Sequence, residues 1–538
     1  MPKDPTPSGT SMTEQEKILA FVGVLVVLFL ASLNLTVVGT AMPRVIAELG
    51  GLQYYAWAFI GYSLTSTLAV LVAGKLSDLY GRKPLVLSGI VLFAVGSVLS
   101  GFSQNMFELV FFRGFQGIGG GVLMSMAFTT IGDIFTPLER GRYQGYTGAV
   151  WGLSSVIGPI VGGFLTDHIG WRWVFFVNLP FAVTALWVIA RYLPSRRAPA
   201  QSRVDYLGVA LFTAAVVPLL LGLTWGGTTY PWISWQTMSL LGAAGVFGAL
   251  FVGWERQAKA PLLDFRLFKN PTFRVANLAG FLNTAGMYAA ILYLPLYMQS
   301  VRQASASGSG VVLTPLMLGL IVTSTLAGQM VSRTGRYKPY ILAGSVAMVV
   351  ALALTSLLGP ETPLWMAFAA MVLLGLALGP INSLLTLAVQ NAAPKAELGM
   401  ATSANQFFRQ IGSTMAATIF GSLMSLYLSH HLLENLGVAA RQLPATALDK
   451  IANPENLNSP EALERTQAAL TRLGGPSFAE HILHGLRLTV SGALSEIFLV
   501  AAGLSLLALL VVVRLPQLEL RGSRPAAAAR PASSAADD

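Results

Sequence analysis

The chain has 538 residues, of which 54% are hydrophobic and only 11% are charged, with no cysteine and a formal net charge of +10. Soluble proteins average about 25% charged residues, so this composition predicts a polytopic membrane protein. The basic residues lie in short loops between apolar runs rather than on one face, which argues against a nucleic-acid-binding protein. The absence of cysteine excludes disulfides and thiolate metal sites.

Apolar stretches of membrane-spanning length follow one another along the chain. A spanning helix needs about 20 mainly apolar residues, and we expect fourteen spans, beginning near residues 18, 55, 84, 106, 141, 171, 205, 236, 273, 310, 338, 363, 401 and 490. Lys and Arg concentrate in one alternating set of loops, whereas the short loops of the other set hold Arg44, Arg172 and Arg302. Because basic residues gather on the cytoplasmic side, the pattern predicts a multi-pass protein of the cell (inner or plasma) membrane with both termini cytoplasmic.

One short motif occurs twice, as GKLSDLYGRKP at 74–84 and GQMVSRTGRYKP at 328–339. In both copies two glycines are seven residues apart, the second is followed by Arg, and the motif joins two spans on the cytoplasmic side. The repeat indicates two related six-span halves with two spans inserted between them, as in secondary transporters. The predicted organisation is a cytoplasmic segment 1–17, a six-helix bundle 18–195, an inserted pair 205–255, a second six-helix bundle 270–515 and a disordered cytoplasmic tail 516–538.

The longest segment between two predicted spans is 430–489, which the loop pattern places outside the cell. Its stretch PEALERTQAALTRL predicts short amphipathic helices that pack on the outer surface, and the alternative is a docking module for an extracytoplasmic partner. All five histidines fall on this external side, including His481 and His484 with a spacing that could bind metal. No acid or cysteine completes such a site, so we expect solvated histidines and no metal.

Several motifs resemble those of the major facilitator superfamily. GKLSDLYGRKP is similar to its signature loop between the second and third spans, RGFQGIGGG at 113–121 to its fourth-span motif, and GPIVGG at 158–163 to its antiporter signature. GWRWVFFVNLP at 170–180 and ANQFFRQIGSTM at 404–415 resemble sequences of the fourteen-span drug:proton antiporter branch. The resemblance covers about 18–515 and implies an all-α major facilitator fold, with two six-helix bundles plus two inserted transmembrane helices.

Two groups of residues are expected to control conformation. The first group is the first copy of the repeat, with Gly74, Asp78, Gly81 and Arg82. The resemblance implies that Asp78 and Arg82 form an ion-pair cluster with Asp133, which holds the cytoplasmic side closed. In the second, a proline kinks an apolar helix and glycines allow close helix approach; these residues are Gly158, Pro159, Gly162 and Gly163. The resemblance implies that the bend of this helix acts at the interface of the two halves.

Proton coupling would use charged residues inside the spans. Arg113 lies in the fourth span, where a guanidinium should face a cavity or a partner, and Gln116 follows on the same helix face. The resemblance implies a role for this arginine in proton transfer. Among the scarce acids, Glu496 in the last span is the main candidate proton site, with Asp133 at a span end. Many members of the family carry an aspartate in the first span where this chain has Asn34, which cannot titrate.

Polar and aromatic residues that punctuate the spans predict a roomy substrate cavity. Such a lining suits lipophilic, often cationic, compounds, although interfacial belts and interhelical hydrogen bonds are alternative roles for its members. The expected cavity residues are Asn34, Thr36, Trp57, Tyr62, Gln116, Asn283, Tyr288, Asn382, Gln406 and Arg409.

The function predicted from these residues and from the resemblance is export of lipophilic or cationic drug-like compounds by alternating access, in exchange for protons. The chain has no phosphate-binding Gly-Lys-Ser/Thr loop and no nucleophile-and-base motif, so we expect no enzyme activity and no cofactor beyond the proton gradient. The expected partners are the bilayer, a small-molecule substrate and protons, and the expected state is a monomer. Two alternatives remain: a lipid or amphiphile exporter or facilitator with weak or no proton coupling, and a non-transporting receptor or scaffold.

Overall fold

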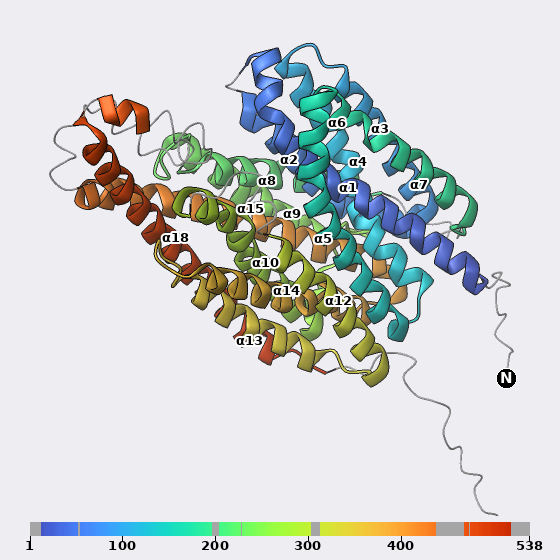
Figure 1. Ribbon diagram of the computed structural model, residues 1–538. Helices are drawn as coiled ribbons and strands as arrows, with labels where there is room; N and C mark the ends of the chain where they lie inside the picture. Colours follow the sequence, from blue (N-terminus) through green and yellow to red (C-terminus); the bar gives the residue numbers. More distant parts are fainter. Residues whose placement is uncertain are drawn as a thin grey trace, which may run out of the picture.

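The protein is almost entirely helical in the computed structural model (Figure 1), which describes residues 12–51, 54–195, 204–227, 229–302, 313–436, 467–472 and 474–517. Within these ranges, fourteen helices are long and apolar enough to cross a membrane. The fold class and the number of spans predicted from the sequence are therefore confirmed.

The first six spans form one bundle, whose helices are α1 (Glu14–Leu49), α2 (Tyr55–Tyr80), α3 (Arg82–Gly101), α4 (Met106–Ile134), α5 (Pro137–His168) and the pair α6 (Trp173–Phe176) and α7 (Asn178–Tyr192). Local sequence fixes where these helices start. Thr13 with Glu16 forms a capping box at the start of α1, and Thr136 with Glu139 forms one at the start of α5. In each box the two side chains satisfy backbone N–H groups that have no partner within the helix.

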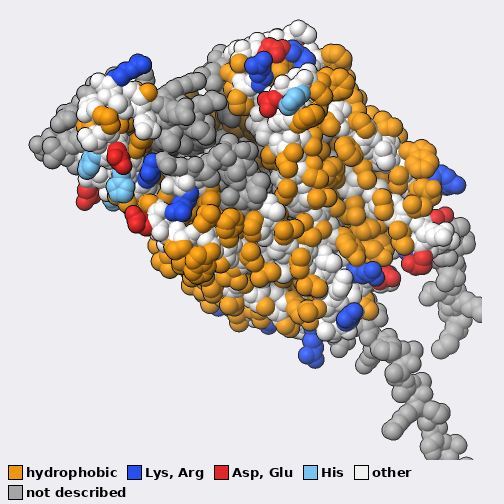
Figure 2. All heavy atoms as spheres, in the orientation of Figure 1, with side chains coloured by type: hydrophobic (Ala, Val, Ile, Leu, Met, Phe, Trp, Pro, Cys, Tyr) orange, Lys and Arg blue, Asp and Glu red, His pale blue; other side chains and the backbone are white. Residues whose placement is uncertain are grey.

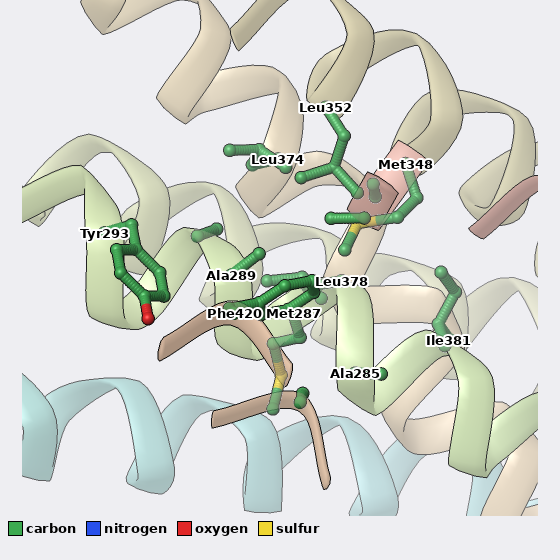
Figure 3. Close-up of a cluster of buried hydrophobic side chains, with 14 of the residues drawn as sticks. Ala285, Met287, Ala289, Tyr293, Met348, Leu352, Leu374, Leu378, Ile381 and Phe420 are labelled. Atoms are coloured by element: carbon green, nitrogen blue, oxygen red, sulfur yellow. The ribbon is translucent and has the colours of Figure 1, made fainter. Parts of the chain in front are cut away.

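The last six spans form the second bundle, with α10 (Pro271–Leu296), α12 (Thr314–Thr334), α13 (Lys338–Thr355), α14 (Leu364–Ala392), α15 (Leu398–Leu436) and α18 (Pro476–Val513). Two 3-10 turns, η2 (Phe265–Lys269) and η4 (Lys395–Glu397), lead into α10 and α15, and the π-helical turn η3 (Tyr297–Val301) extends α10. The core of this bundle is apolar: Figure 3 shows Met287, Met348, Leu374 and Phe420 converging from α10, α13, α14 and α15.

Two further spans, α8 (Tyr206–Trp225) and α9 (Trp235–Glu255), form a hairpin beside both bundles. Phe212 of α8 packs against Phe407 of α15 with ring centroids 5.2 Å apart, and Trp225 packs against Trp57 of α2 at 5.5 Å. Helix α9 touches little besides α8, and its Val246, Phe247 and Leu250 are exposed, as suits a helix that faces lipid. The face of the protein drawn in Figure 2 has a similar surface: hydrophobic side chains cover its middle, and charged side chains gather at its two ends.

The spans of both bundles end at two opposite faces of the protein, the terminal face and the distal face. Because the number of spans is even, α1 begins and α18 ends on one side, the terminal face. The loops of both repeat copies lie there too, and Tyr337 of the second copy donates a hydrogen bond to the carbonyl of Pro516 beyond α18 (3.0 Å). The opposite side, where α1 ends and α18 begins, is the distal face.

The two six-helix bundles touch mainly next to the terminal face. Ser125 Oγ of α4 lies 2.5 Å from Ser403 Oγ of α15, and Gln144 Nε2 of α5 donates to Gln390 Oε1 of α14 at 3.1 Å. Towards the distal face the two bundles diverge, as Figure 1 shows. A molecule between them is therefore shut off from the terminal face.

The segment 430–489 differs from its predicted form, because the flanking helices extend far into it. Helix α15 continues to Leu436 and α18 begins at Pro476, so the last span starts well before the predicted residue 490. Most of the predicted amphipathic stretch 460–473 lies outside the described residues. The histidines at both ends belong to α15 and α18, and no group of metal-binding side chains occurs in the described part of the chain.

Candidate functional site: a central cavity and the cluster that closes it

The second glycine of each repeat copy ends a helix in a conformation that favours glycine. Gly81 has φ of +92° between α2 and α3, and Gly335 has φ of +68° between α12 and α13. Side chains with a Cβ are strained in this region, whereas glycine is not. The recurrence of glycine in the motif thus has a backbone cause in both halves.

Asp78, Arg82 and Asp133 form a cluster at the terminal face. Arg82 Nη1 lies 2.7 Å from Asp78 Oδ1, and Arg82 Nε lies 2.5 Å from Asp133 Oδ2. The Asp78 side chain is only 8% exposed. The three residues predicted to pair are therefore brought together, and they join α2, α3 and the end of α4 within the first bundle.

Asp78 also connects the two bundles. It accepts hydrogen bonds from the backbone N–H groups of Gly399 (3.0 Å) and Met400 (2.8 Å), in the first turn of α15. A carboxylate at a helix N-terminus meets unpaired donors and the positive end of the helix dipole. The approach needs Gly74, because a Cβ there would lie 2.7 Å from the Gly399 carbonyl oxygen and would collide with Ser403.

The second copy of the repeat makes the equivalent contact without charge. Ser332, which matches Asp78, donates a hydrogen bond to the carbonyl of Leu138 in the first turn of α5 (2.7 Å). Gly328, which matches Gly74, lies directly against Gly141 of the same helix. Both copies therefore dock the second span of one half onto the fifth span of the other, one through a carboxylate and the other through a hydroxyl.

Asn34 and Arg113 form the centre of a buried polar network in the first bundle. Arg113 Nη1 donates to Asn34 Oδ1 and to Gln116 Oε1, each at 2.6 Å, and the guanidinium lies over the Tyr62 ring at 4.4 Å. Gln116 Nε2 in turn donates to Ser97 Oγ at 2.5 Å. Arg113 is 1% exposed, and no carboxylate of the described residues forms a salt bridge with it.

Thr36 and Thr40 hold α1 against α5. Thr36 donates to the carbonyls of Leu33 (3.0 Å) and, across the interface, Ser154 (3.3 Å). A Cβ on Gly158 would lie 2.7 Å from Thr36 Cβ, and one on Gly162 would lie 2.8 Å from the Val37 carbonyl oxygen. Gly163 is different, because a Cβ there would meet nothing within 4 Å. Pro159 lies between these contacts, inside the continuous helix α5.

A central cavity of about 180 Å³ lies between the two bundles. Four of the residues predicted for the substrate cavity line it, namely Tyr288, Asn382, Gln406 and Arg409. Five further residues of the second bundle line it: Thr284, Met287, Ser383, Gln410 and Ser413. The first bundle contributes Leu28, Leu35, Val70, Met124, Phe128, Thr147, Gly148 and Trp151.

The other predicted cavity residues lie elsewhere. Asn34, Tyr62 and Gln116 belong to the Arg113 network, and Thr36 faces α5. Trp57 packs on Trp225. Asn283 is buried on α10, where its amide donates to the Ala279 carbonyl at 3.0 Å.

Glu496, the main predicted proton site, lies apart from all these groups. It is exposed on α18, on the same side of the helix as the exposed Leu499, Leu506 and Leu510. It is not part of the cavity lining, and Asp133 is engaged with Arg82 at the terminal face.

Arg409 is the charged residue of the cavity lining. Its Nη1 donates to the Asn382 carbonyl at 3.2 Å, and its Nη2 donates to Asn382 Oδ1. The side chain is partly exposed, whereas Arg113 is enclosed. Beside it, Gln406 Nε2 is buried without a hydrogen-bond partner.

Sequence reasoning missed Ser125, Ser403, Gln144 and Gln390, which join the bundles, and Trp151, which lines the cavity. Small hydroxyl residues and lone amides occur throughout the spans, so no local pattern distinguishes these positions.

Two bundles of six membrane-spanning helices, each with a Gly-Arg loop after its second span and with a central cavity between them, are the architecture of a membrane transporter. Residues 24–417 match the family model described as "Major Facilitator Superfamily", and the chain belongs to that superfamily. It is 39% identical over 497 residues to the multidrug transporter protein MdtP of Bacillus subtilis, covering 90% of each chain. It is 34% identical to multidrug resistance protein 3 of the same organism, covering 81% of this chain and 85% of that protein.

The fold is shared with distant transporters of known structure. The human organic anion transporter MFSD10 has a TM-score of 0.61 at 15% identity, covering 92% of this chain and 99% of that one. The proton:xylose symporter XylE has a TM-score of 0.56 at 13% identity, covering 94% and 96%. These similarities show the fold alone.

Proposed function

We propose that this protein exports amphiphilic drug-like compounds across the cell membrane by alternating access. The observation that carries the proposal is a cavity built from both bundles and sealed at the terminal face by contacts between them. The names of MdtP and multidrug resistance protein 3 support drug-like cargo. The lining agrees, because Phe128, Trp151 and Met287 offer an adaptable apolar surface next to a few polar groups.

The transport cycle follows from which contacts must break. With the terminal face closed, the cavity can exchange only towards the distal face. Opening the terminal face requires Asp78 to leave the first turn of α15 and Ser332 to leave the first turn of α5. The close packing of Gly74 on α15 and of Gly328 on α5 must separate with them. A transporter needs the closed and open states to stay close in free energy, so new contacts must form when these break.

The proposed orientation places the terminal face in the cytoplasm, because its loops carry the Lys and Arg residues that gather on that side. A single chain encloses the cavity, so we propose that a monomer transports. The chain contains no cysteine, and single cysteines placed in its loops can therefore be labelled from one side of intact cells. Labelling of the α2–α3 loop by a membrane-impermeant reagent would contradict this orientation.

We further propose that export is coupled to the entry of protons, so that the proton gradient is the energy source. Such coupling needs a group that binds a proton in one state and releases it in the other. Asp78 and Asp133 are candidates, because opening the terminal face would remove Asp78 from its backbone donors. A second candidate function is export without proton coupling, and it is favoured by the absence of a carboxylate from the described lining of the central cavity.

The test is an export assay in an efflux-deficient bacterial host, followed by proteoliposomes. We expect the protein to lower the accumulation of several amphiphilic compounds, and a variant locked at the terminal face to lose this effect. Failure to export any compound, with the protein present in the membrane, would favour a receptor or scaffold. In proteoliposomes, substrate-dependent proton release would support exchange, and transport without proton movement would support the uncoupled alternative.

A further inference from the structure

The central cavity carries a single kind of charge. Its lining contains Arg409 and no acidic residue within the described part of the chain. No salt bridge to a described residue neutralises this guanidinium. A cavity that is mostly apolar strengthens such a charge, because the local dielectric is low. The cavity is therefore electropositive.

Arg409 has donors to spare. A guanidinium has five N–H donors, and in this structure both of its hydrogen bonds go to Asn382. Arg113 provides a comparison within the same protein: it is fully enclosed, and it donates to Asn34, Gln116 and the carbonyl of Ala58 beneath the Tyr62 ring. Arg113 thus makes three hydrogen bonds within the enclosed interior of the first bundle, whereas Arg409 makes two and lies in the cavity wall.

A second hydrogen-bond donor, the amide of Gln406, lies beside Arg409 in the cavity wall. Gln406 lies three residues before Arg409 on α15, so the two side chains share one face of the helix. Both line the cavity, and Gln406 Nε2 is buried with no acceptor. A buried amide N–H without a partner costs free energy unless an acceptor arrives. Two neighbouring residues in the wall of one cavity therefore carry N–H donors that are not engaged.

The opposite wall is apolar. Leu28 and Leu35 of α1, with Val70, Met124, Phe128, Gly148 and Trp151, form most of the first bundle's part of the lining. Its one polar side chain, Thr147, donates its hydroxyl to the Gln144 carbonyl of its own helix at 2.7 Å. The donors come from α15 in the second bundle. A ligand that satisfies both walls has an apolar body and a head group rich in hydrogen-bond acceptors.

We propose that Arg409 and Gln406 form a subsite for an anionic head group, and that the cargo of this transporter is an amphiphilic anion such as a hydrophobic carboxylate or sulfonate. The inference rests on the proposed export function and specifies the charge of its substrate. Of the lipophilic or cationic cargo expected from sequence, it keeps the lipophilic body and argues against a cationic head group, because a cation would lie beside an uncompensated guanidinium.

The test uses three probes that differ only in the head group: a dansyl-labelled fatty acid, its methyl ester and the matching dansyl alkylammonium. Export is measured in proteoliposomes for the wild type, Arg409→Gln, Arg409→Lys and Gln406→Leu. Arg333→Gln, which removes an exposed arginine at the end of α12 away from the cavity, is the matched control.

The wild type should prefer the carboxylate to the alkylammonium. Loss of a charged hydrogen-bond donor should lower the carboxylate-to-ester ratio of kcat/KM by about 10- to 100-fold in Arg409→Gln, and by less in Gln406→Leu. Arg409→Lys should retain part of the preference, since it keeps the charge but not the planar fork. The ratio in Arg333→Gln should equal that of the wild type.

The outcomes distinguish a failure of the anionic subsite from a failure of the export function. A wild type that exports the ester or the alkylammonium but not the carboxylate overturns the anionic subsite and leaves export intact. An unchanged carboxylate-to-ester ratio of kcat/KM in Arg409→Gln also overturns the anionic subsite and leaves export intact. If that variant does not fold, the affinities of the three probes are measured in purified wild type and Gln406→Leu by energy transfer from the ten tryptophans of the protein to the dansyl group. Equal affinity for all three probes excludes the subsite. A wild type that transports none of the probes and none of the screened compounds contradicts the export function itself.

Discussion

Asp78 Oδ2 accepts a hydrogen bond of 2.8 Å from the backbone N–H of Met400, which joins the second span of one half to the thirteenth span in the other. We predict that Asp78→Asn weakens the closed terminal face by about 1.5–3 kcal/mol, since it removes the charge that both Arg82 and the α15 N-terminus bind. Spin labels on cysteines at the exposed Ser88 and Thr334 would report the change. Their distance distribution should gain a longer component.

The comparison variant is Ser332→Ala, which removes the hydroxyl of the second copy. Because this contact is neutral, its loss should shift the distribution less, by about 0.5–1.5 kcal/mol. An equal effect of the two substitutions would mean that charge contributes nothing to closure.

The contact between Ser125 and Ser403 gives a second prediction. Their Oγ atoms lie 2.5 Å apart, and the chain has no other cysteine to interfere. The double variant Ser125→Cys/Ser403→Cys should form a disulfide under oxidation, lock the terminal face and abolish export, with recovery on reduction. Each single variant should export normally under both conditions. Persistent export by the fully crosslinked protein would show that the bundles need not separate here.

The glycines of α5 give a third prediction with an internal control. Gly158→Ala and Gly162→Ala should each destabilise the packing of α1 on α5 by about 1–3 kcal/mol through steric overlap, and should reduce export. Gly163→Ala should do neither, because the space beside Gly163 is open. Thermal unfolding in detergent and export rates measure both effects. A loss in Gly163→Ala as large as in its neighbours would contradict the steric explanation.

The Arg113 network gives a fourth prediction. Asn34→Asp places a carboxylate 2.6 Å from Arg113 Nη1, in a position of full burial. The first span then carries a group that can bind and release a proton, so export should become pH-dependent and substrate addition should release protons in proteoliposomes. Asn34→Leu is the control, since it removes the acceptor and leaves Arg113 with one partner fewer. Identical pH profiles for wild type and Asn34→Asp would exclude this site from coupling.

Glu496 gives a fifth prediction, which reverses its expected role. Its side chain is exposed on the outer side of α18 and absent from the cavity. Glu496→Gln should therefore keep the wild-type export rate and pH dependence within about twofold, as exposed substitutions usually do. A tenfold loss of export in this variant would restore Glu496 as a coupling residue.

The features that the sequence predicted well depend on short-range patterns. Hydropathy determines the fourteen spans, because a bilayer demands long apolar helices with internally paired backbones. The paired glycines at 74 and 81, and at 328 and 335, revealed the repeat because helix packing and a left-handed turn leave no other residue type. Asp78, Arg82 and Asp133 were recognisable as a group because all three lie at span ends on the same side, where the resemblance implies an ion-pair cluster.

The sequence did not predict the features that depend on contacts between distant residues or on which side of a helix faces its neighbours. Asn34 and Arg113 are 79 residues apart, and only packing of α1 on α4 shows that the amide serves this guanidinium. The same is true of Glu496, since a hydropathy profile gives its depth but not the side of α18 on which it lies. Gly163 belongs to the same motif as Gly158 and Gly162 but points away from α1, a difference that spacing alone does not reveal.

The lone guanidinium of Arg409 makes the proposed transport cycle sensitive to voltage in a specific step. When the cavity is empty, its fixed positive charge changes its exposure to the membrane field as the bundles rock, and one charge crossing 100 mV is worth about 2.3 kcal/mol. When a monoanion is bound, the two charges cancel and the field has little to act on. An inside-negative potential would therefore draw the empty carrier back towards the cytoplasm, ready to load, and leave the loaded outward step almost electrically silent.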